Sequence, residues 1–234
     1  MRKKQERIEL VVASRNQKKV EEIKEILKEL NLKITSLRDY PGAPYIIENG
    51  KTFRENAEKK ARKIARFTQK LTLGEDSGLE VAVLGGKPGV YSSRFSGRDK
   101  NDLKNNLKLL SLLQDLPFSK RKARYVCSVA LADKDGLIGV VGGTCSGIIG
   151  YQMRGSYGFG YDPLFIPYLS EFPKGSVRGK GAGFIIPKYK KTFAQLGPRI
   201  KHKMSHRFRA LTKAKGIIRT YLNEKILTKT YGAL

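Results

Sequence analysis

This sequence of 234 residues has no tryptophan, only two cysteines and fewer than half as many acidic as basic residues. Two cysteines cannot build a disulfide scaffold, and since Cys127 and Cys145 fall on neighbouring predicted strands, we expect two buried thiols. No apolar run approaches the roughly 20 residues of a membrane span, and the charged N-terminus lacks the apolar core of a signal peptide. We therefore expect a cytoplasmic protein with no membrane segment, folded as one domain over residues 1–234.

The shortage of acidic residues leaves a formal net charge of +26, which is unevenly distributed. From Ser170 to the C-terminus, sixteen basic residues stand against two acidic ones, Glu171 and Glu224. Such a field attracts polyanions, either nucleic acid or a nucleoside triphosphate. Since neither RNA-module aromatics nor zinc-finger spacing is present, we favour a solvated basic surface over specific nucleic-acid binding, which stays an alternative.

Apolar periodicity predicts strands that alternate with helices, and Asp133–Gly136 predicts a hairpin turn. The pattern predicts an α/β fold, with a mixed central β-sheet and helices on both faces. One predicted helix, over 101–113, has Leu103, Leu107 and Leu110 on its apolar face. Residues 168–190 are basic, rich in glycine and aperiodic, and we interpret them as a flexible loop.

Two adjacent carboxylates, Glu75 and Asp76, follow the short apolar run 71–73. We expect that strand to stop at Gly74 and to present both acids on a turn. At the carboxyl end of a strand such a pair suits Mg²⁺, although an ordinary surface turn is the alternative. Glu48 precedes a helix with Thr52 as N-cap, and it is either a metal ligand or an acid favoured by the helix dipole.

Three further segments have the composition of anion or nucleotide sites. Ser14 and Asn16 stand where a strand turns into a helix, and they either bind an anion or simply cap the helix. The segment 158–163 has two glycines and two aromatics, which either stack on a base or form a tight turn. His206 and Arg207 place donors in the first turn of the last helix, where an anionic or carbonyl partner is expected.

Six segments, taken in order, resemble the inosine triphosphate pyrophosphatase family, which hydrolyses deaminated purine nucleoside triphosphates. The resemblance extends over residues 8–222 and rests on residues 11–22, 52–61, 75–81, 84–94, 158–163 and 205–211. It implies two lobes with an active-site cleft between them, Mg²⁺-dependent hydrolysis of ITP, dITP or XTP to the monophosphate and pyrophosphate, and a homodimer. The family's pattern assigns no role to 168–190.

The resemblance also implies roles for individual residues. Asp76 matches the general base, and Glu48, Glu75 and Asp76 match the metal ligands. The positions that match the substrate-binding residues are Ser14, Arg15, Asn16, Gln17, Lys18, Lys19, Lys60, Ser77, Phe159, Gly160, Tyr161, Asp162, Lys201, His206 and Arg207.

Two other functions remain open at this point. One is a nucleotide pyrophosphatase of the septum-inhibitor type, which acts on modified pyrimidines; the purine-edge residues Lys201, His206 and Arg207 argue against it. The other is a basic nucleic-acid-binding protein with a degenerate pocket, which would bind through the basic C-terminal third.

Overall fold

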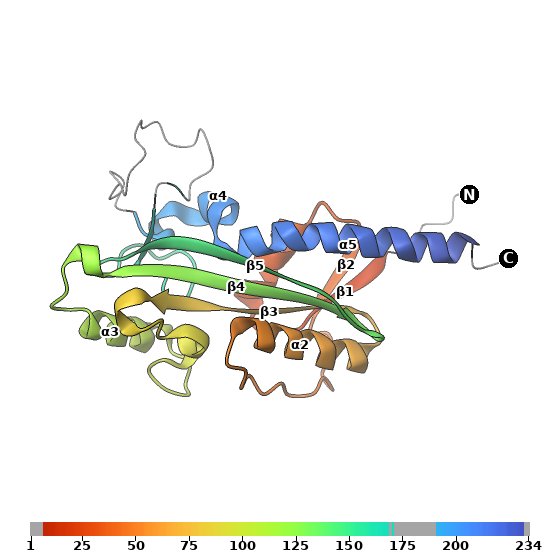
Figure 1. Ribbon diagram of the computed structural model, residues 1–234, viewed down its shortest axis with the longest axis horizontal. Coiled ribbons are helices and arrows are strands. Elements are labelled where there is room, and N and C mark those ends of the chain that lie inside the picture. Colours follow the sequence, from red (N-terminus) through yellow and green to blue (C-terminus); the bar gives the residue numbers. More distant parts are fainter. Residues whose placement is uncertain (1–6, 169, 171–190, 232–234) are drawn as a thin grey trace. The chain divides into compact units, whose positions relative to one another are not determined.

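The computed structural model describes residues 7–168, 170 and 191–231. Six strands form one sheet in the order β2-β1-β3-β4-β5-β6 (Figure 1). The strands are β1 (Ile8–Val12), β2 (Leu32–Ser36), β3 (Leu71–Val81), β4 (Lys122–Asp133), β5 (Gly136–Ile149) and β6 (Phe165–Pro167). The helices are α1 (Gln17–Leu27), α2 (Phe53–Thr68), α3 (Asp102–Leu112), α4 (Phe193–Met204) and α5 (His206–Tyr231), with short 3-10 helices η1 (Ala82–Leu84), η2 (Gly89–Arg94) and η3 (Phe118–Lys120).

The sheet is mixed, as predicted. β1 pairs in parallel with β2 and with β3, so that Leu10 lies opposite Ile34 and Leu71. β6 runs antiparallel to β5. The predicted hairpin turn joins β4 to β5, where the Asp133 carboxylate accepts hydrogen bonds from the backbone N–H groups of Asp135 and Gly136.

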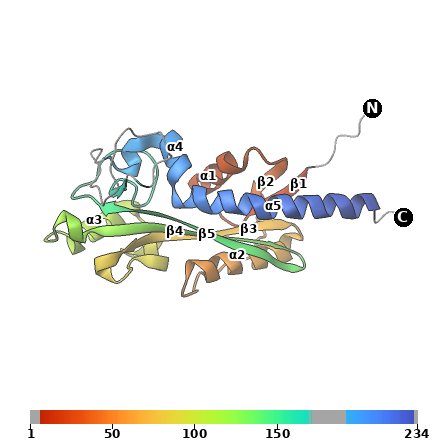
Figure 2. The same ribbon diagram turned by 45° about the horizontal axis from the view of Figure 1, so that its top comes forward.

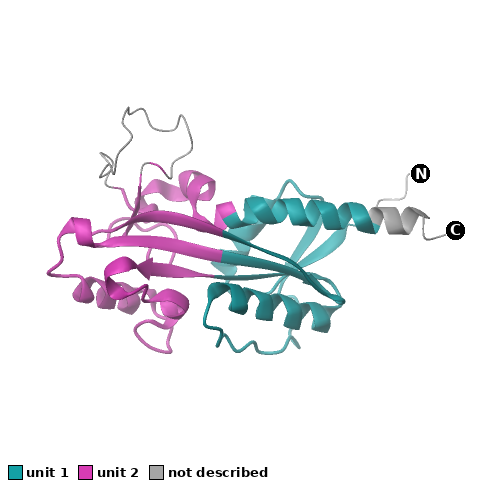
Figure 3. Ribbon diagram, in the orientation of Figure 1, with its two compact units in different colours: residues 1–76, 128–142, 210–234 teal, residues 77–127, 143–209 magenta. Residues whose placement is uncertain are grey.

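The chain divides into two compact units (Figure 3). Unit 1 consists of residues 1–76, 128–142 and 210–234, and unit 2 of residues 77–127 and 143–209. The two lobes with a cleft implied by the family resemblance stay a prediction. The predicted loop at 168–190 falls mostly on residues 169 and 171–190, which lie outside the described part of the chain.

In unit 1, helices cover both faces of the strands, with α2 on one face and α5 on the other (Figures 1 and 2). Close packing depends on small residues on each face. On the α2 side, Ala57, Ala61 and Ala65 form a cluster with alanines of β4. On the α5 side, a Cβ added to Gly139 of β5 would lie 2.9 Å from Cδ1 of Ile217.

The prediction that the third strand stops at Gly74 and presents Glu75 and Asp76 on a turn is wrong, because β3 continues to Val81 and carries both acids in its interior. Gly74 is a site of close approach and not a turn. A Cβ on it would overlap the carbonyl oxygen of Ala57 and would lie 2.6 Å from the backbone nitrogen of Ala61. The glycine therefore lets α2 lie against the strand, and both acids are placed beneath a helix.

In unit 2, α3 and α4 cover opposite faces of the strands around an apolar core (Figure 1). Leu109 and Leu113 contribute to this core from the α3 side, and Phe193 and Met204 contribute from α4. Cys145 belongs to the same cluster, and Cys127 is buried as well, so the expectation of two buried thiols is confirmed.

The apolar face predicted for the helix at 101–113 is wrong at two of its three leucines. Leu103 and Leu107 are half exposed, whereas Leu110 packs against the core and the buried residues of α3 include Asn105 and Asn106. These amides are buried because they hold neighbouring loops. Asn105 accepts hydrogen bonds from the backbone and hydroxyl of Ser96, at 2.7 and 2.8 Å. A satisfied amide such as that of Asn105 can therefore take the place of a leucine at a packed face.

Helix α4 was not predicted, because Gly197 and Pro198 interrupt its pattern. Gly197 has φ of 72° and lies at a kink inside the helix. The start of the helix is nonetheless strongly specified, because Thr192 and Gln195 form a capping box. In the part of the chain that is described, no helix is both long and apolar enough to cross a membrane.

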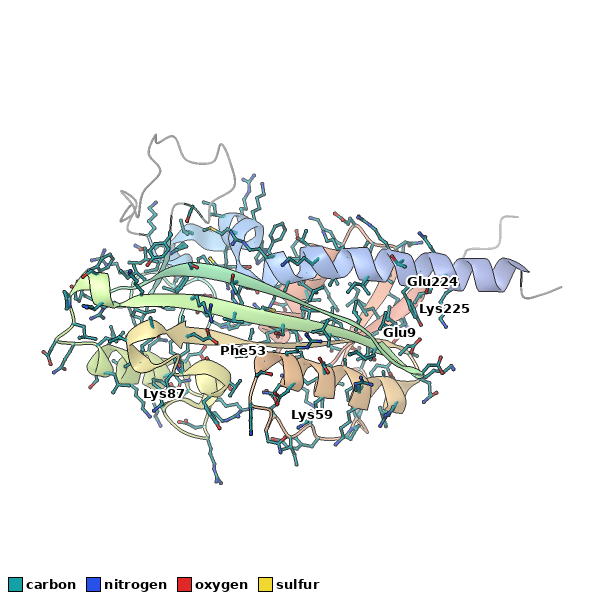
Figure 4. The ribbon with its side chains drawn as sticks, in the orientation of Figure 1. Glu9, Phe53, Lys59, Lys87, Glu224 and Lys225 are labelled. Carbon is teal, nitrogen blue, oxygen red and sulfur yellow. The ribbon has the colours of Figure 1, made fainter. Side chains whose placement is uncertain are left out.

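Glu9 lies on β1 (Figure 4) and is the centre of a polar network. Its carboxylate accepts hydrogen bonds from Thr35 at 2.8 Å, from Lys70 at 2.9 Å and from the hydroxyl of Tyr40. Burial raises the pKa of Glu9, but these hydrogen bonds outweigh it and lower the pKa to about 2. Glu9 is therefore ionised throughout the range in which the protein is expected to work.

Replacing Gly74 by alanine is expected to lower the free energy of unfolding by about 1–3 kcal/mol, because the added methyl group overlaps the α2 backbone. Urea denaturation followed by circular dichroism measures this loss. The matched control is Gly216→Ala on α5, where a Cβ meets nothing within 4 Å. That variant should gain about 0.5–1 kcal/mol of helix stability. Equal effects of the two substitutions would refute the close-approach role of Gly74.

Glu9→Gln should destabilise the protein in a pH-dependent way. Since folding lowers the pKa of Glu9, its contribution is fully present above the ordinary glutamate pKa of about 4.5 and is lost as the pH falls through about 2. The difference in unfolding free energy between wild type and variant should thus be constant above pH 5 and shrink toward pH 2. The control Glu25→Gln removes an exposed pair with Lys28 and should change stability by less than about 0.5 kcal/mol at any pH.

Candidate active site

Five charged side chains converge in unit 1, and we call them the carboxylate–lysine group: Lys19, Glu48, Lys60, Glu75 and Asp76. The Lys60 ammonium lies 3.0 Å from Glu48 Oε2 and 3.0 Å from Asp76 Oδ1. It also donates to the backbone carbonyl of Glu75 at 3.1 Å. The Lys19 ammonium lies 2.8 Å from Glu75 Oε2.

Local structure explains how distant residues meet here. Lys60 lies three residues after Ala57, on the face of α2 that packs on the strands, and α2 begins at its predicted N-cap, Thr52. β3 carries Glu75 and Asp76 beneath that face because Gly74 lets the helix approach. Three of the group, Lys60, Glu75 and Asp76, are at most 6% exposed.

Burial and neighbouring charges shift the pKa values of Lys60 and Asp76 in opposite directions. Burial by itself lowers the pKa of Lys60, but the facing charges of Asp76, Glu48 and Glu75 outweigh it and raise the pKa, so the ammonium stays protonated. Burial raises the pKa of Asp76 above its ordinary value, and the attraction of Lys60 and Lys19 offsets only part of that shift. Asp76 is thus a more basic carboxylate than an exposed aspartate.

Asn56 also contacts this group, although it is not among the residues predicted from the sequence. Its Nδ2 donates to Asp76 Oδ2 at 3.1 Å, and its Oδ1 accepts from the backbone N–H of Gly50 at 2.8 Å. The side chain therefore joins the carboxylate to the segment before α2. Its position four residues before Lys60 places both on one face of the helix, which is a signal that the sequence contains.

The segment 14–19 is placed at the N-terminus of α1, as predicted. Asn16 is the N-cap and accepts a hydrogen bond from the backbone of Lys19, and Ser14 Oγ accepts one from the backbone of Asn16. Arg15 donates to the carbonyl of Ala43 at 3.1 Å. Of this segment, Lys19 is the residue that reaches the carboxylate–lysine group, whereas residues 15–18 are exposed.

A second group forms in unit 2 around the buried carboxylate of Asp162. Its Oδ2 accepts from the Lys201 ammonium at 2.8 Å and from the backbone N–H of Phe159 at 2.9 Å. Lys201 also lies 4.8 Å from the centre of the Phe159 ring, and Arg207 lies 5.5 Å from it. This Asp162 group therefore places two cations beside one aromatic face.

The loop from Gly158 to Asp162 is held rigidly at several points. Gly158 has φ of 88°, and a Cβ there would overlap the Asp162 carboxylate. Two side chains of α3 bind the backbone of Gly160. Its N–H donates to Asp102 at 2.7 Å, and its carbonyl accepts from Asn106 at 2.8 Å. Tyr161 is buried and donates its hydroxyl proton to the carbonyl of Ser92 at 2.9 Å.

The start of α5 contributes three more residues to unit 2. Ser205 is the N-cap predicted from the sequence, and its hydroxyl accepts from the backbone of Phe208 at 3.1 Å. His206 and Arg207 are 3% and 1% exposed. Arg207 donates to the hydroxyl of Ser77 at 3.0 Å, so these two predicted residues lie together.

The carboxylate–lysine group contains the type of ligand that a divalent cation such as Mg²⁺ prefers. Glu48, Glu75 and Asp76 offer hard oxygen ligands, and the five side chains of the carboxylate–lysine group sum to a formal charge of −1. Among the described residues, however, no three His, Cys, Asp or Glu side chains form a ready ligand cluster.

Comparison with known proteins identifies relatives over most of the chain. A model of the Ham1 family matches residues 10–217. A protein named dITP/XTP pyrophosphatase from Desulforamulus reducens is 42% identical over 220 residues, which are 94% of this chain and 100% of that protein. A protein of the same name from Bacillus cereus is 43% identical over 209 residues, 88% of this chain and 92% of that protein.

Solved structures agree with these matches. The Ham1 protein of Staphylococcus aureus aligns with a TM-score of 0.73 at 33% identity, covering 91% of this chain and 99% of that one. A HAM1 protein from Coxiella burnetii aligns with a TM-score of 0.75, also at 33% identity and with the same coverage. The fold class and the family resemblance drawn from the six sequence segments are confirmed. This chain belongs to the Ham1 family.

Proposed function

We propose that this protein is a nucleoside-triphosphate pyrophosphatase that hydrolyses deaminated purine nucleotides such as ITP, dITP and XTP to the monophosphate and pyrophosphate. The observation that carries the proposal is the carboxylate–lysine group, in which three carboxylates, two of them buried, form ion pairs with the ammonium groups of Lys19 and Lys60. Relatives more than 40% identical over most of the chain are named for this activity. They are named for purine nucleotides, so the pyrimidine and nucleic-acid alternatives gain no support.

Asp76 is the proposed general base. Burial raises its pKa, which makes it a better proton acceptor for an attacking water than an ordinary aspartate. Asn56 and Lys60 each bond one of its oxygens and thereby fix its orientation. Because both partners are hydrogen-bond donors, they favour the ionised form of the carboxylate.

The cations of the same group are proposed to bind phosphate. Lys19 and Lys60 carry positive charge where an incoming triphosphate needs it. The partly buried Ser14 and the exposed residues Arg15, Asn16, Gln17 and Lys18 at the start of α1 extend that region. A divalent ion, which we propose to be Mg²⁺ held by Glu48, Glu75 and Asp76, would supply Lewis-acid neutralisation of the phosphate oxygens when bound. Glu48 is the most exposed of the three acids, with 36% of its side chain accessible.

The Asp162 group is proposed to recognise the base. Phe159 offers a half-buried aromatic face for stacking, within a loop that Gly160, Tyr161 and Asp162 hold in place. Lys201, His206 and Arg207, with Ser77 beside Arg207, supply donors for the 6-oxo group of hypoxanthine or xanthine. Adenine has an amino group there, which would leave buried donors unpaired and so disfavour ATP.

We further propose a cytoplasmic homodimer, as the family resemblance implies, with nucleic acid not a required partner. Independently of the oligomeric state, the net charge of +26 favours association with a polyanionic nucleotide.

A substrate panel tests the proposal. In the presence of Mg²⁺ the purified chain should release pyrophosphate, and not orthophosphate, from ITP, dITP or XTP, with kcat/KM for ATP lower by at least about 100-fold. Release of orthophosphate, or equal rates with ITP and ATP, would contradict it. Modified pyrimidine triphosphates in the same panel distinguish the septum-inhibitor type.

Asp76→Asn tests the assignment of the base. The amide cannot accept the proton of water, so kcat for ITP should fall by about 10²–10⁴-fold while the fold is retained. Circular dichroism and the melting temperature check the fold. The control Asp115→Asn, at an exposed position, should keep full activity. Full activity of Asp76→Asn would remove Asp76 from this role.

A further inference from the structure

Tyr125 on β4 is a buried residue of unit 2 that contacts both His206 and Asp162. Its ring stacks on the ring of His206, with centres 4.5 Å apart and planes at 8°. It is also nearly parallel to Phe193, at 5.9 Å and 11°, and it packs against Phe165 at 4.7 Å. The two phenylalanines belong to the apolar core, so the Tyr125 ring connects His206 to a rigid support.

The hydroxyl of Tyr125 contacts Asp162, the carboxylate at the centre of the Asp162 group. It donates to Asp162 Oδ1 at 3.3 Å, whereas Asp162 Oδ2 accepts from Lys201 and from the backbone of Phe159. Burial, together with the charge of Asp162, raises the pKa of Tyr125 well above its ordinary value. The hydroxyl therefore remains a hydrogen-bond donor at every working pH.

We propose that Tyr125 is a positioning residue for base recognition. One side chain fixes the plane of the His206 ring by stacking and donates a hydrogen bond to Oδ1 of Asp162, whereas Lys201 donates to Oδ2. Asp162 is then held with its other oxygen toward Lys201 and the Phe159 backbone, so two donors and the stacking face keep a constant geometry. The inference rests on the proposed function, because it assigns a role within base recognition.

A purely structural tyrosine at this position would behave differently. Packing against Phe165 and Phe193 requires only an aromatic ring, which phenylalanine supplies equally well. The hydroxyl, in contrast, is buried and needs a partner, and its partner is the same carboxylate that binds Lys201. Tyr125→Phe therefore separates the two roles, because it keeps the ring and removes one hydrogen bond.

The experiment compares Tyr125→Phe and Tyr125→Leu with the control Tyr151→Phe. Tyr151 is 57% exposed and contacts the Phe118 ring and the Arg121 guanidinium. For each protein, kcat and KM for ITP are measured together with the inhibition constant of inorganic tripolyphosphate, which carries phosphates but no base. The melting temperature of each variant is recorded in parallel.

Tyr125→Phe should raise KM for ITP about threefold to tenfold through loss of one hydrogen bond, with kcat changed less than about twofold. Tyr125→Leu, which also loses the stacking, should raise KM further, by about tenfold to 100-fold. Inhibition by tripolyphosphate should stay within about twofold of wild type for both, and Tyr151→Phe should match wild type. If Tyr125→Leu does not fold, Tyr125→Phe decides the question.

Two outcomes would overturn the inference alone: Tyr125→Phe with wild-type KM for ITP, or a parallel weakening of ITP and tripolyphosphate binding, which indicates general damage. A wild-type protein that releases no pyrophosphate from ITP would instead overturn the proposed function and this inference with it. The wild-type measurement thus distinguishes the two failures.

Discussion

The structure depends on one buried ammonium group, that of Lys60. An unpaired charge cannot be buried without a large cost, and removing one partner of a buried pair typically costs about 3–5 kcal/mol. Lys60 meets this constraint by binding Asp76, Glu48 and the carbonyl of Glu75 at 3.0–3.1 Å. The pairing in turn allows two acids to stand inside β3 under a helix, where water alone could not solvate them. Burial in this arrangement raises the pKa of Asp76, and the attraction of Lys60 offsets part of that shift.

Much of the fold could be predicted because local signals agree with it. The predicted hairpin at Asp133–Gly136 and the N-caps Thr52 and Ser205 are found where the sequence places them. The errors share a cause, which is that tertiary contacts override a local pattern. Gly74 looks like a strand end, but it serves the approach of a helix, and α3 buries Asn105 instead of Leu107 because loops supply partners for the amide.

The sequence indicates which charged residues are candidates for the site, but it does not indicate which hydrogen bonds hold them in place. The acids at 75 and 76 stand out because two adjacent like charges follow an apolar run, and the donors at 206 and 207 stand out because the helix dipole disfavours positive charge in the first turn. Asn56 and Tyr125 do not stand out, since an amide on a helix and a tyrosine on a strand are ordinary in sequence. Their importance comes from the particular oxygen that each one bonds, on Asp76 and on Asp162, and only three-dimensional packing specifies those contacts.

The most direct test of this account is a double-mutant cycle between Lys60 and Asp76, measured as free energies of unfolding in the absence of divalent metal. Lys60→Met leaves buried acids without their ammonium, and it should be strongly destabilising, whereas adding Asp76→Asn should recover part of the loss. The account predicts a coupling energy of about 1–3 kcal/mol. Single effects that add to within about 0.5 kcal/mol would contradict it, because the two charges would then not depend on each other.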